Sequence, residues 1–599
     1  MATTTEHRSS LLNVIQQPQV QSLLEDARTQ IEREEGVSFR TINIDKQFRK
    51  PYEHNFTANQ RPHTTLLFGG LTFRHEHLLE GALKSLGYTV APVPTPNCDS
   101  FQLGKEYGNN GQCNPTYFTV GNLVQYLQWL RDEKGFSTQY IIDHYIFLTA
   151  GACGPCRFGM YEAEYRLALR NAGFDGFRVM LFQQKGGLEQ GDLEAGLKMD
   201  LDFFLGMINA FNMGDVINEV TNQIRPYERE VGETDRVMNE GLKFMHDVMS
   251  QHTVARFDGT VADLLETRSP SLHGTLSKLT KFVDQLAGDE YMAPLRTFRD
   301  RLDDIELDRL QPKPIVKITG EFWAHTTEGD GNFNMFRFLQ TEGAEIIVEP
   351  LATWLTYMMW QTKIKARDRK GLLEGAEEPK WYEFSRLAKR EGERLKKMAV
   401  IGAADFIFRR EYKKIVDNLG GTAAPIVDMY ELERLGHEFY HTRQEGGEGH
   451  LEVAKNIYYS TKNLCHMVLS LKPFGCMPST QSDGTQSAVI NRFRDMIFLP
   501  IETSGEGEIN AHSRVQMALG EAKAKAKREF AEVLDSLPYS LEELREYVAQ
   551  HRELRRPFYK FPRDTKGVAG TAAHFAIHLA KRMQAEGVEP RHAVDAAAQ

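Results

Sequence analysis

The stretch that decides the fold is residues 64–94, TTLLFGGLTFRHEHLLEGALKSLGYTVAPVP. Its first apolar run, TTLLFGG, ends in two glycines, and RHEHLLEGALKSLG has the spacing of a helix that stops at Gly87. A second apolar run, YTVAPVP, is closed by prolines. A strand, a helix and a strand with short connections form a βαβ unit, and the two strands of such a unit are parallel. We therefore predict an α/β protein built on parallel sheets.

Outward from this stretch, α/β segments alternate with helical ones. The predicted fold class is α/β, with several Rossmann-like parallel-sheet lobes and helical insertions. The predicted segments are an N-terminal helical extension at 1–60, a first α/β lobe at 61–188, a helical region at 189–310, a second α/β lobe at 311–356, a basic helical region at 357–435, a third α/β lobe at 436–537, and a C-terminal helical tail at 538–599.

Composition excludes several classes of protein. The 599 residues are 41% hydrophobic and 26% charged, with a net charge of −10, which rules out disorder and collagen. The most apolar run, residues 201–211, is too short to span a bilayer and contains Asp202 and Asn209. The N-terminus has no secretory pattern. We expect a cytoplasmic protein without a membrane or nucleic-acid partner. The basic, aromatic segment 551–566 is interpreted as a solvated tail whose aromatic side chains pack back on the body.

Cysteine is the informative residue type. The chain has only six, at positions 98, 113, 153, 156, 465 and 476. A chain this long buries a core without disulfides, and the cytosol keeps thiols reduced. The cysteines are therefore buried thiols, redox thiols or metal ligands.

The sharpest motif is TAGACGPCRFG at residues 149–159, which follows a predicted strand and opens a predicted helix. Cys153 and Cys156 would face the positive end of that helix, which favours thiolate. One interpretation is a thioredoxin-like dithiol, but no proline stands between Pro155 and Pro226 to supply the proline that this fold places opposite the dithiol. A second is structural zinc, although zinc modules usually present two close cysteine pairs and this chain has one.

The third interpretation is an iron–sulfur cluster at the carboxyl ends of strands from different lobes. Cys113 in GNNGQCNP and Cys476 in KPFGCMPS stand in glycine- and proline-rich turns, where backbone N–H groups can approach sulfides. Cys98 in PNCD and Cys465 in NLCHM are equally compatible with structural thiols, and Cys465 falls inside a predicted helix.

Several strings in the order found here resemble one family, the acyl-CoA dehydratase activase-related proteins, which are relatives of 2-hydroxyacyl-CoA dehydratase and benzoyl-CoA reductase. They are GQCNPTYFTVGNLVQYL, FLTAGACGPCRFGMYEAEYR, GEFWAHTTEGDGNFNMFRFLQTEGAEI, KPFGCMPST and FLPIETSGEGEINAHSR, within residues 60–535. The resemblance implies a [4Fe–4S] or double-cubane [8Fe–9S] cluster between Rossmann-like lobes. It carries over Cys113, Cys153, Cys156 and Cys476 as ligands, and Cys98 and Cys465 less clearly.

The same resemblance implies a separate partner, an iron–sulfur ATPase of actin-like fold that supplies low-potential electrons. Larger members carry that ATPase on the same chain, but no GxxxxGK[ST] loop or actin-like phosphate loop is found here. The glycine clusters at Gly329–Gly331 and Gly446–Gly449 are interpreted as turns. We therefore expect the partner, and not this chain, to bind and hydrolyse ATP. Assembly of the chain into a homo-oligomer is a further possibility.

The leading functional hypothesis is reduction or dehydration of a small substrate, with a CoA thioester as one option, at the cysteine-ligated cluster. The alternatives are a non-catalytic electron-transfer or regulatory subunit and a thiol oxidoreductase at Cys153/Cys156. Glu321 and Trp323, which follow a predicted strand, are candidates to line the cleft. The sequence does not identify a proton donor among its histidines, which include His437, His441, His450, His466 and His512, or Glu506.

Overall fold

The computed structural model describes residues 20, 22–23, 26–27, 29–30, 56–151, 156–183, 196–252, 277, 290–369, 380, 382–444 and 446–591. The chain divides into two compact units, Met1–Tyr52 and Glu53–Gln599. The described residues of the first unit are helical, and most of the predicted N-terminal extension lies outside the described residues.

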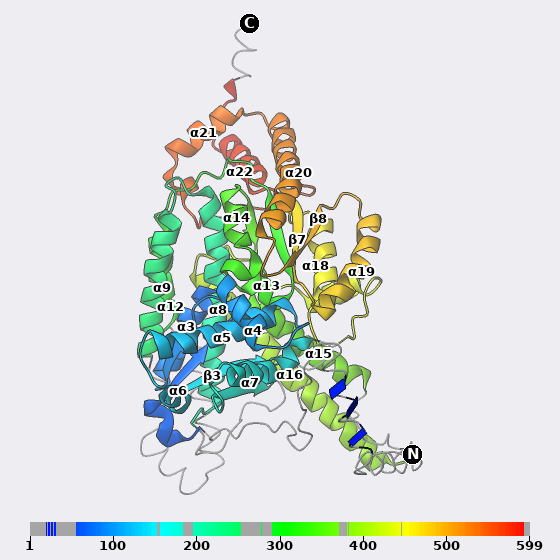
Figure 1. Ribbon diagram of the computed structural model, residues 1–599. Coiled ribbons are helices and arrows are strands. Elements are labelled where there is room, and N and C mark those ends of the chain that lie inside the picture. The colour runs from blue at the N-terminus through cyan, green and yellow to red at the C-terminus, as the bar shows by residue number, and fades with distance from the viewer. Residues whose placement is uncertain are drawn as a thin grey trace, which may run out of the picture. The chain divides into compact units, whose positions relative to one another are not determined.

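Two four-stranded sheets, both wholly parallel, organise this unit (Figure 1). Their strand orders are β2-β1-β3-β4 and β6-β5-β7-β8. The α/β fold class is thus confirmed. The strands are β1 (Thr65–Phe68), β2 (Thr89–Pro92), β3 (Tyr145–Gly151), β4 (Arg178–Gln183), β5 (Ile315–Gly320), β6 (Glu345–Ile347), β7 (Met467–Pro473) and β8 (Phe498–Thr503).

The predicted second and third lobes are one structural layer. Strand β5 pairs with β6 on one side and with β7 on the other, with Val316 opposite both Ile346 and Met467. The division into separate lobes at 311–356 and 436–537 was therefore wrong. Every residue of β5 is buried, so the strand needs partners on both sides, and the second one comes from beyond the basic helical region.

Helices cover both faces of the first sheet. Residues of α3, α8, α9 and α12 share one apolar core with β1, and α5, α6 and α7 build the other core against β3 and β4. The helices of this half are α3 (Phe73–Ser85), α4 (Cys98–Tyr107), α5 (Asn114–Asp132), α6 (Thr138–His144), α7 (Tyr161–Asn171), α8 (Leu201–Ile224), α9 (Glu233–Gln251) and α12 (Met292–Asp303).

The second sheet packs against α14 and α20 on one face and against α18 on the other. Helices α20, α21 and α22 form a further core toward the C-terminus. The remaining helices are α13 (Phe322–Thr326), α14 (Met335–Thr341), α15 (Leu351–Asp368), α16 (Phe384–Asn418), α17 (Met429–Gly436), α18 (Gly449–Thr461), α19 (Met477–Arg492), α20 (Glu508–Ser536), α21 (Leu541–Gln550) and α22 (Thr571–Ala585), with 3₁₀ turns η1 (Ala58–His63), η2 (Arg157–Met160), η3 (Arg225–Tyr227), η4 (Gly329–Asn332) and η5 (Arg552–Arg555).

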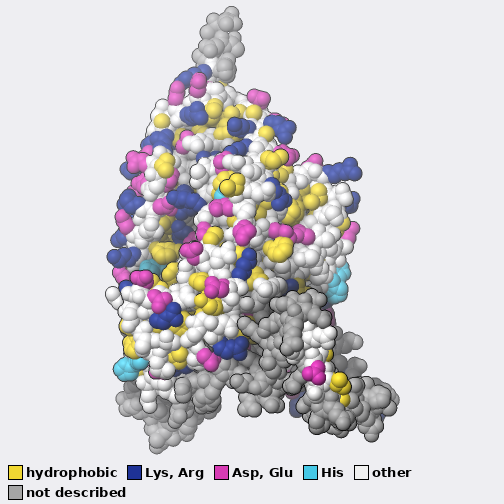
Figure 2. All heavy atoms as spheres, in the orientation of Figure 1, with side chains coloured by type: hydrophobic (Ala, Val, Ile, Leu, Met, Phe, Trp, Pro, Cys, Tyr) yellow, Lys and Arg dark blue, Asp and Glu magenta, His cyan; other side chains and the backbone are white. Residues whose placement is uncertain are grey.

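The predicted solvated tail at 551–566 packs against the body of the protein. Arg555 pairs with Glu306 at 3.0 Å, and the Phe561 ring packs at a tilt against Phe575 of α22 with ring centres 5.2 Å apart. On the face drawn in Figure 2, basic and acidic side chains are interspersed. In the described part of the chain, no helix is long and apolar enough to cross a membrane.

A buried ionic cluster lies beneath the second sheet. Lys317 of β5 is completely buried, and its Nζ lies 2.7 Å from Glu349 Oε2, which also lies 3.4 Å from Lys455 Nζ of α18. Burial alone would raise the pKa of Glu349, but the charges of Lys317 and Lys455 outweigh burial and lower it. Because the pKa falls on folding, the pair stabilises the protein above the pKa of an unfolded glutamate and loses this effect as the pH falls.

Substituting Glu349→Gln is expected to lower the free energy of unfolding by about 3 kcal/mol at pH 7, because it leaves buried lysines without a counter-charge. Urea unfolding followed by circular dichroism measures this. The matched control is Glu342→Gln, which removes a surface pair to Lys523 and is expected to cost less than about 1 kcal/mol. Equal losses in the two variants would contradict the assignment.

Candidate functional site at the cysteine turns

Three predicted ligand cysteines each stand directly before a helical turn. Cys113 stands at the N-cap of α5, Cys476 at that of α19 and Cys156 at that of η2. The Cys113 thiol also lies 3.2 Å from the Thr116 hydroxyl in the first turn of α5. Prolines stand in the first turns of α5 and α19, as they do at many helix starts. The free N–H groups of a helix start favour an anionic ligand or thiolate. Cys153 lies outside the described residues.

The Cys113 and Cys476 turns touch through their backbones and thereby join the two sheets. The Asn114 N–H donates to the Phe474 carbonyl at 3.0 Å. Gly475 has φ +78°, and a Cβ there would lie 3.4 Å from the Cα of Cys113. Only glycine accepts that conformation readily while leaving room for the opposite turn. The left-handed φ at residue 475 therefore favours glycine, and a Cβ there would also lie 3.3 Å from the Gln112 carbonyl of the opposite turn.

Cys156 belongs to the same place. Its electrostatic neighbours are Glu448, Glu321 and Cys113, and those of Cys476 include Glu321 and Glu452. The Cys113 thiol lies 3.1 Å from the Tyr161 hydroxyl, at the start of α7. Cys156 and Cys476 thus share Glu321 as an electrostatic neighbour, and Cys113 is a neighbour of Cys156. Glu448, Glu452 and Tyr161 carry no sequence motif, and the sequence did not identify them as part of the site.

Glu448 reaches this position because a glycine-rich loop lies against the Cys476 turn. A Cβ on Gly447, which has φ +104°, would collide with the ring of Pro478, and one on Gly449 would collide with the Tyr440 hydroxyl. The cluster at 446–449 is a turn, as predicted. Its glycines also allow the chain to pass close over α19 and bring Glu448 toward the thiols.

Burial and negative charge together govern proton affinity here. Burial, then Glu448 and Glu321, raise the pKa of Cys156, and burial, then Glu321, raise that of Cys476. Burial raises the pKa of Glu321 to about 7 and, with Glu321 nearby, that of Glu448 to about 8. Near neutral pH the Cys156 and Cys476 thiols therefore keep their protons, and Glu321 and Glu448 are protonated for part of the time. A bound cation would replace these protons.

One carboxylate of the group has its own counter-charge. Glu452 lies 3.7 Å from Lys472 Nζ of β7 and accepts a hydrogen bond from Ser479 at 2.8 Å. Lys472 also pairs with Asp483 of α19. Glu321 instead caps α13, with the Ala324 N–H donating at 3.0 Å. The group of thiols, Glu321 and Glu448 therefore has more potential negative charge than nearby lysines balance.

Cys98 lies away from this group. It is exposed at the first turn of α4, its backbone N–H donates to Asp330 at 2.9 Å, and burial and Asp330 raise its pKa to about 11. Helix α4 packs on α5 with the Ser100 carbonyl against Gly121. Gly121 is eight residues along α5 from Cys113, or about 12 Å at 1.5 Å per residue.

Cys465 lies at the opposite end of the sheet, and its prediction as a helical residue was wrong. Helix α18 ends at Thr461, and Cys465 precedes β7, packed among Ile315, Tyr459 and Val468. The seven residues of β7 separate it from Cys476, about 20 Å at 3.3 Å per residue. Cys465 therefore cannot ligate the same centre as Cys476, and it is a buried thiol of the core.

The other candidate residues make different contacts or, in the case of Glu506, are exposed at the surface. Trp323 packs on Phe118 with ring centres 5.5 Å apart, and Glu506 is exposed. The five histidines are held by other contacts. His437 bonds Thr442, His441 accepts from the Arg443 N–H, His450 stacks on Trp360, His466 accepts from the Ile315 N–H, and His512 bonds the Phe333 carbonyl.

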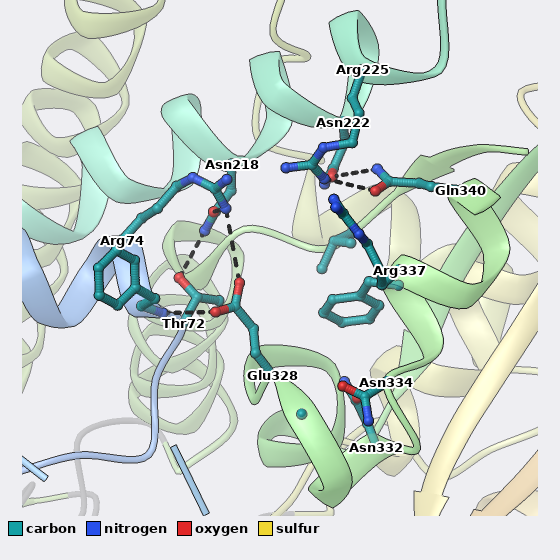
Figure 3. A pocket seen from close by; sticks show the side chains of 14 residues that line it. Thr72, Arg74, Asn218, Asn222, Arg225, Glu328, Asn332, Asn334, Arg337 and Gln340 are labelled. Atoms are coloured by element: carbon teal, nitrogen blue, oxygen red, sulfur yellow. Dashed lines mark hydrogen bonds and ion pairs between the residues drawn. The ribbon is translucent and has the colours of Figure 1, made fainter. Parts of the chain in front are cut away.

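A cavity of about 360 Å³ opens at the carboxyl ends of strands from both sheets (Figure 3). Its walls include Thr72, which follows β1 and caps α3, and Val348, which follows β6. Glu328 also lines it and stands two residues beyond α13, the short helix that Glu321 caps. One short helix therefore connects the cavity to the cysteine turns. In open α/β sheets, ligands bind at this edge.

Three arginines from three helices line the cavity, whereas Glu328 is the single carboxylate among its lining residues. Arg74 donates to Asn218 at 3.1 Å and lies 3.8 Å from Glu328 (Figure 3). Arg225 donates to Gln340 at 2.7 Å, and Arg225 and Arg337 share Asp235. With amides filling the rest of the polar wall, the cavity is suited to an anionic ligand.

No protein-family model matches the sequence, and no curated protein matches it significantly. The site is therefore interpreted from its own geometry and chemistry.

In the metal-free, reduced protein, alkylation of Cys156 by iodoacetamide is expected to be slow at pH 8 and to accelerate as the pH rises toward 10, because the thiolate reacts and its pKa is raised. Glu448→Gln removes a negative charge and should accelerate the reaction, by about tenfold for each unit that the pKa falls. Peptide mass spectrometry gives the rate at each cysteine. Glu506→Gln serves as the control, and equal rates in the two variants would refute the proximity of Glu448 to the thiol.

Proposed function

We propose that the chain is an iron–sulfur protein in which Cys113, Cys153, Cys156 and Cys476 ligate one cluster, and that it reduces or dehydrates a small acyl substrate. The observation that carries the proposal is the meeting of three cysteine turns, far apart in the sequence, at the carboxyl ends of two parallel sheets. Cys153 is included from its motif.

The spacing of the thiols favours a cluster over a single ion. Among the described residues, the one group of potential ligand atoms that all lie within 4.8 Å of one another contains no cysteine. Zinc needs ligands packed that closely, because each bond is about 2.0–2.3 Å long, whereas a cluster of several irons spreads its thiolates over a larger volume. The positions of Cys98 and Cys465 support a [4Fe–4S] cluster over the six-thiolate double cubane within one chain.

The residues around the thiols fit the chemistry of reduction. A bound cluster of this type supplies electrons at low potential. Glu321 and Glu448 have pKa values raised to about 7 and about 8, so each holds a proton for part of the time at neutral pH beside the thiols. Such groups are matched to proton transfer near neutrality. We propose Glu448 as the donor and Glu321 as the group that keeps its pKa raised.

Electrons are proposed to come from a separate ATPase, as the family resemblance implies. The exposed apolar side chains beside the cysteine turns support entry of electrons from a protein partner: Met160, Phe474 and Met477 are 60%, 64% and 51% exposed. Exposed apolar residues gathered at one place are typical of interaction surfaces. They bring a docked partner within a few residues of Cys156 and Cys476.

The arginine-lined cavity is proposed to hold the anionic part of the substrate. Guanidinium groups pair with phosphate or carboxylate oxygens through charge-assisted hydrogen bonds. The phosphates of a CoA thioester would match Arg74 and Arg337, and α13 would connect that end of the substrate to the cysteine turns.

Two alternatives receive less support. A thiol oxidoreductase needs an accessible cysteine of low pKa, whereas burial and carboxylates raise the pKa of Cys156. A pure electron carrier needs no arginine-lined cavity. With the ATPase, a strong reductant and candidate acyl-CoA substrates present, a carrier would show reduction of its cluster without product, and this result would replace the enzyme by the alternative.

Anaerobic reconstitution should give about four irons and four sulfides per chain, as expected for a [4Fe–4S] cluster. Cys113→Ser, Cys156→Ser and Cys476→Ser are each expected to lose most of the iron and the visible absorption. Iron and sulfide assays with electron paramagnetic resonance of the reduced protein measure this.

The matched controls are Cys465→Ser and Cys98→Ser, which should retain the cluster. Eight irons, or loss of the cluster in both controls, would overturn the four-cysteine assignment and favour the double cubane. A colourless protein with stoichiometric zinc would refute the iron–sulfur proposal altogether.

Coenzyme A is expected to bind the reconstituted protein, and Arg74→Gln or Arg337→Gln should each weaken binding about tenfold or more, because a hydrogen bond to a charged group contributes about 1.5–3 kcal/mol. Isothermal titration calorimetry measures the affinity. Arg434→Gln, an exposed substitution on α17, should leave it unchanged. Unchanged affinity in all three variants would place the CoA site elsewhere.

A further inference from the structure

A second group of potential metal ligands lies where α3 packs against α9. His77 and Glu80 come from α3 and His246 from α9, all are partly buried, and their candidate ligand atoms lie within 4.8 Å of one another. Glu80 Oε2 is 3.6 Å from His77 Nδ1 and 3.7 Å from His246 Nε2. One nitrogen of each imidazole thus lies near the same carboxylate oxygen.

These separations are close to those of a bound zinc ion. Zinc holds nitrogen and oxygen ligands at about 2.0–2.1 Å in tetrahedral geometry, which places ligand atoms about 3.3–3.4 Å apart. The observed 3.6 and 3.7 Å exceed this by a few tenths of an ångström. The two ring nitrogens lie within 4.8 Å of each other, and rotation of the stacked rings would be needed to direct both at one ion.

The groups behind the ligands hold them in the orientation that a metal requires. Lys84 binds the other carboxylate oxygen of Glu80 at 2.7 Å, so Oε2 is left for the imidazoles. Asp247 lies 3.2 Å from His246 Nδ1, which leaves Nε2 directed at Glu80. A histidine ligand whose second ring nitrogen bonds a carboxylate is the usual arrangement in zinc sites.

The candidate ligand nitrogen of His246 makes no hydrogen bond. His246 Nε2 is buried and has no hydrogen-bond partner, and buried polar atoms are normally satisfied. The His77 and His246 rings stack with centres 4.4 Å apart. Gly81 makes this proximity of the helices possible, because a Cβ there would lie only 2.9 Å from the His246 carbonyl.

We propose that His77, Glu80 and His246 bind a divalent transition-metal ion of the zinc type, which links α3 to α9. Two imidazoles and one carboxylate suit zinc, and three protein ligands leave a fourth position for water. The site lies on helices that cover the first sheet, contains no cysteine, and does not depend on the function proposed for the cysteine turns.

Zinc titration of the metal-free, full-length protein tests the site. The double variant His77→Gln/His246→Gln should bind one zinc ion fewer per chain than the wild type. Elemental analysis after gel filtration measures this difference. Any zinc that the cysteines take up is the same in both proteins and cancels in the comparison. Cobalt bound at this site should give the wild type visible absorption bands that the double variant lacks. Because the site contains no cysteine, these bands should not be accompanied by sulfur-to-metal charge transfer.

His144→Gln on α6 is the surface control and should bind as the wild type does. Glu80→Gln, which preserves both helices' packing, should weaken zinc binding at least tenfold and reduce the rise in melting temperature on adding zinc. Equal zinc content and equal cobalt spectra in the wild type and the double variant would overturn the proposal, whatever the cysteine centre binds.

Discussion

The backbone contact between the Cys113 and Cys476 turns holds the candidate site together. Cys113 precedes α5, which packs on the first sheet, and Cys476 follows β7 of the second. The hydrogen bond from Asn114 to Phe474 and the close approach at Gly475 fix the two carboxyl edges against each other. Without this contact the cysteines would belong to two separate sheets and the carboxylates between them would face water.

Charge in the site follows from that geometry. Thiols at helix starts would ordinarily have lowered pKa values, because the helix end is positive. Here burial and the shared carboxylates dominate, and the pKa values of Cys156 and Cys476 rise instead. Protons accumulate at a place that is short of cations. Such a site is poised to exchange protons for a metal centre, and its carboxyl groups titrate close to neutral pH.

The fold also separates the places where different chemistries can occur. The arginine-lined cavity and the cysteine turns lie at the two ends of α13. The His77–Glu80–His246 group lies instead between α3 and α9. The arginines, the thiols and the imidazole pair are thus kept apart, and this limits competition between different ions and substrates for one site.

By itself, the sequence determined the parallel α/β class and the glycine- and proline-rich setting of Cys113 and Cys476, because apolar periodicity and turn residues act locally. Which strands share a sheet was decided by the tertiary structure, since β5 satisfies its second edge with β7 from beyond a long insertion. The same long-range packing placed Glu448 beside the thiols and Cys465 at the opposite end of β7. Residues that meet through pairing of distant strands leave no local pattern, so no periodicity or spacing in the sequence reports them.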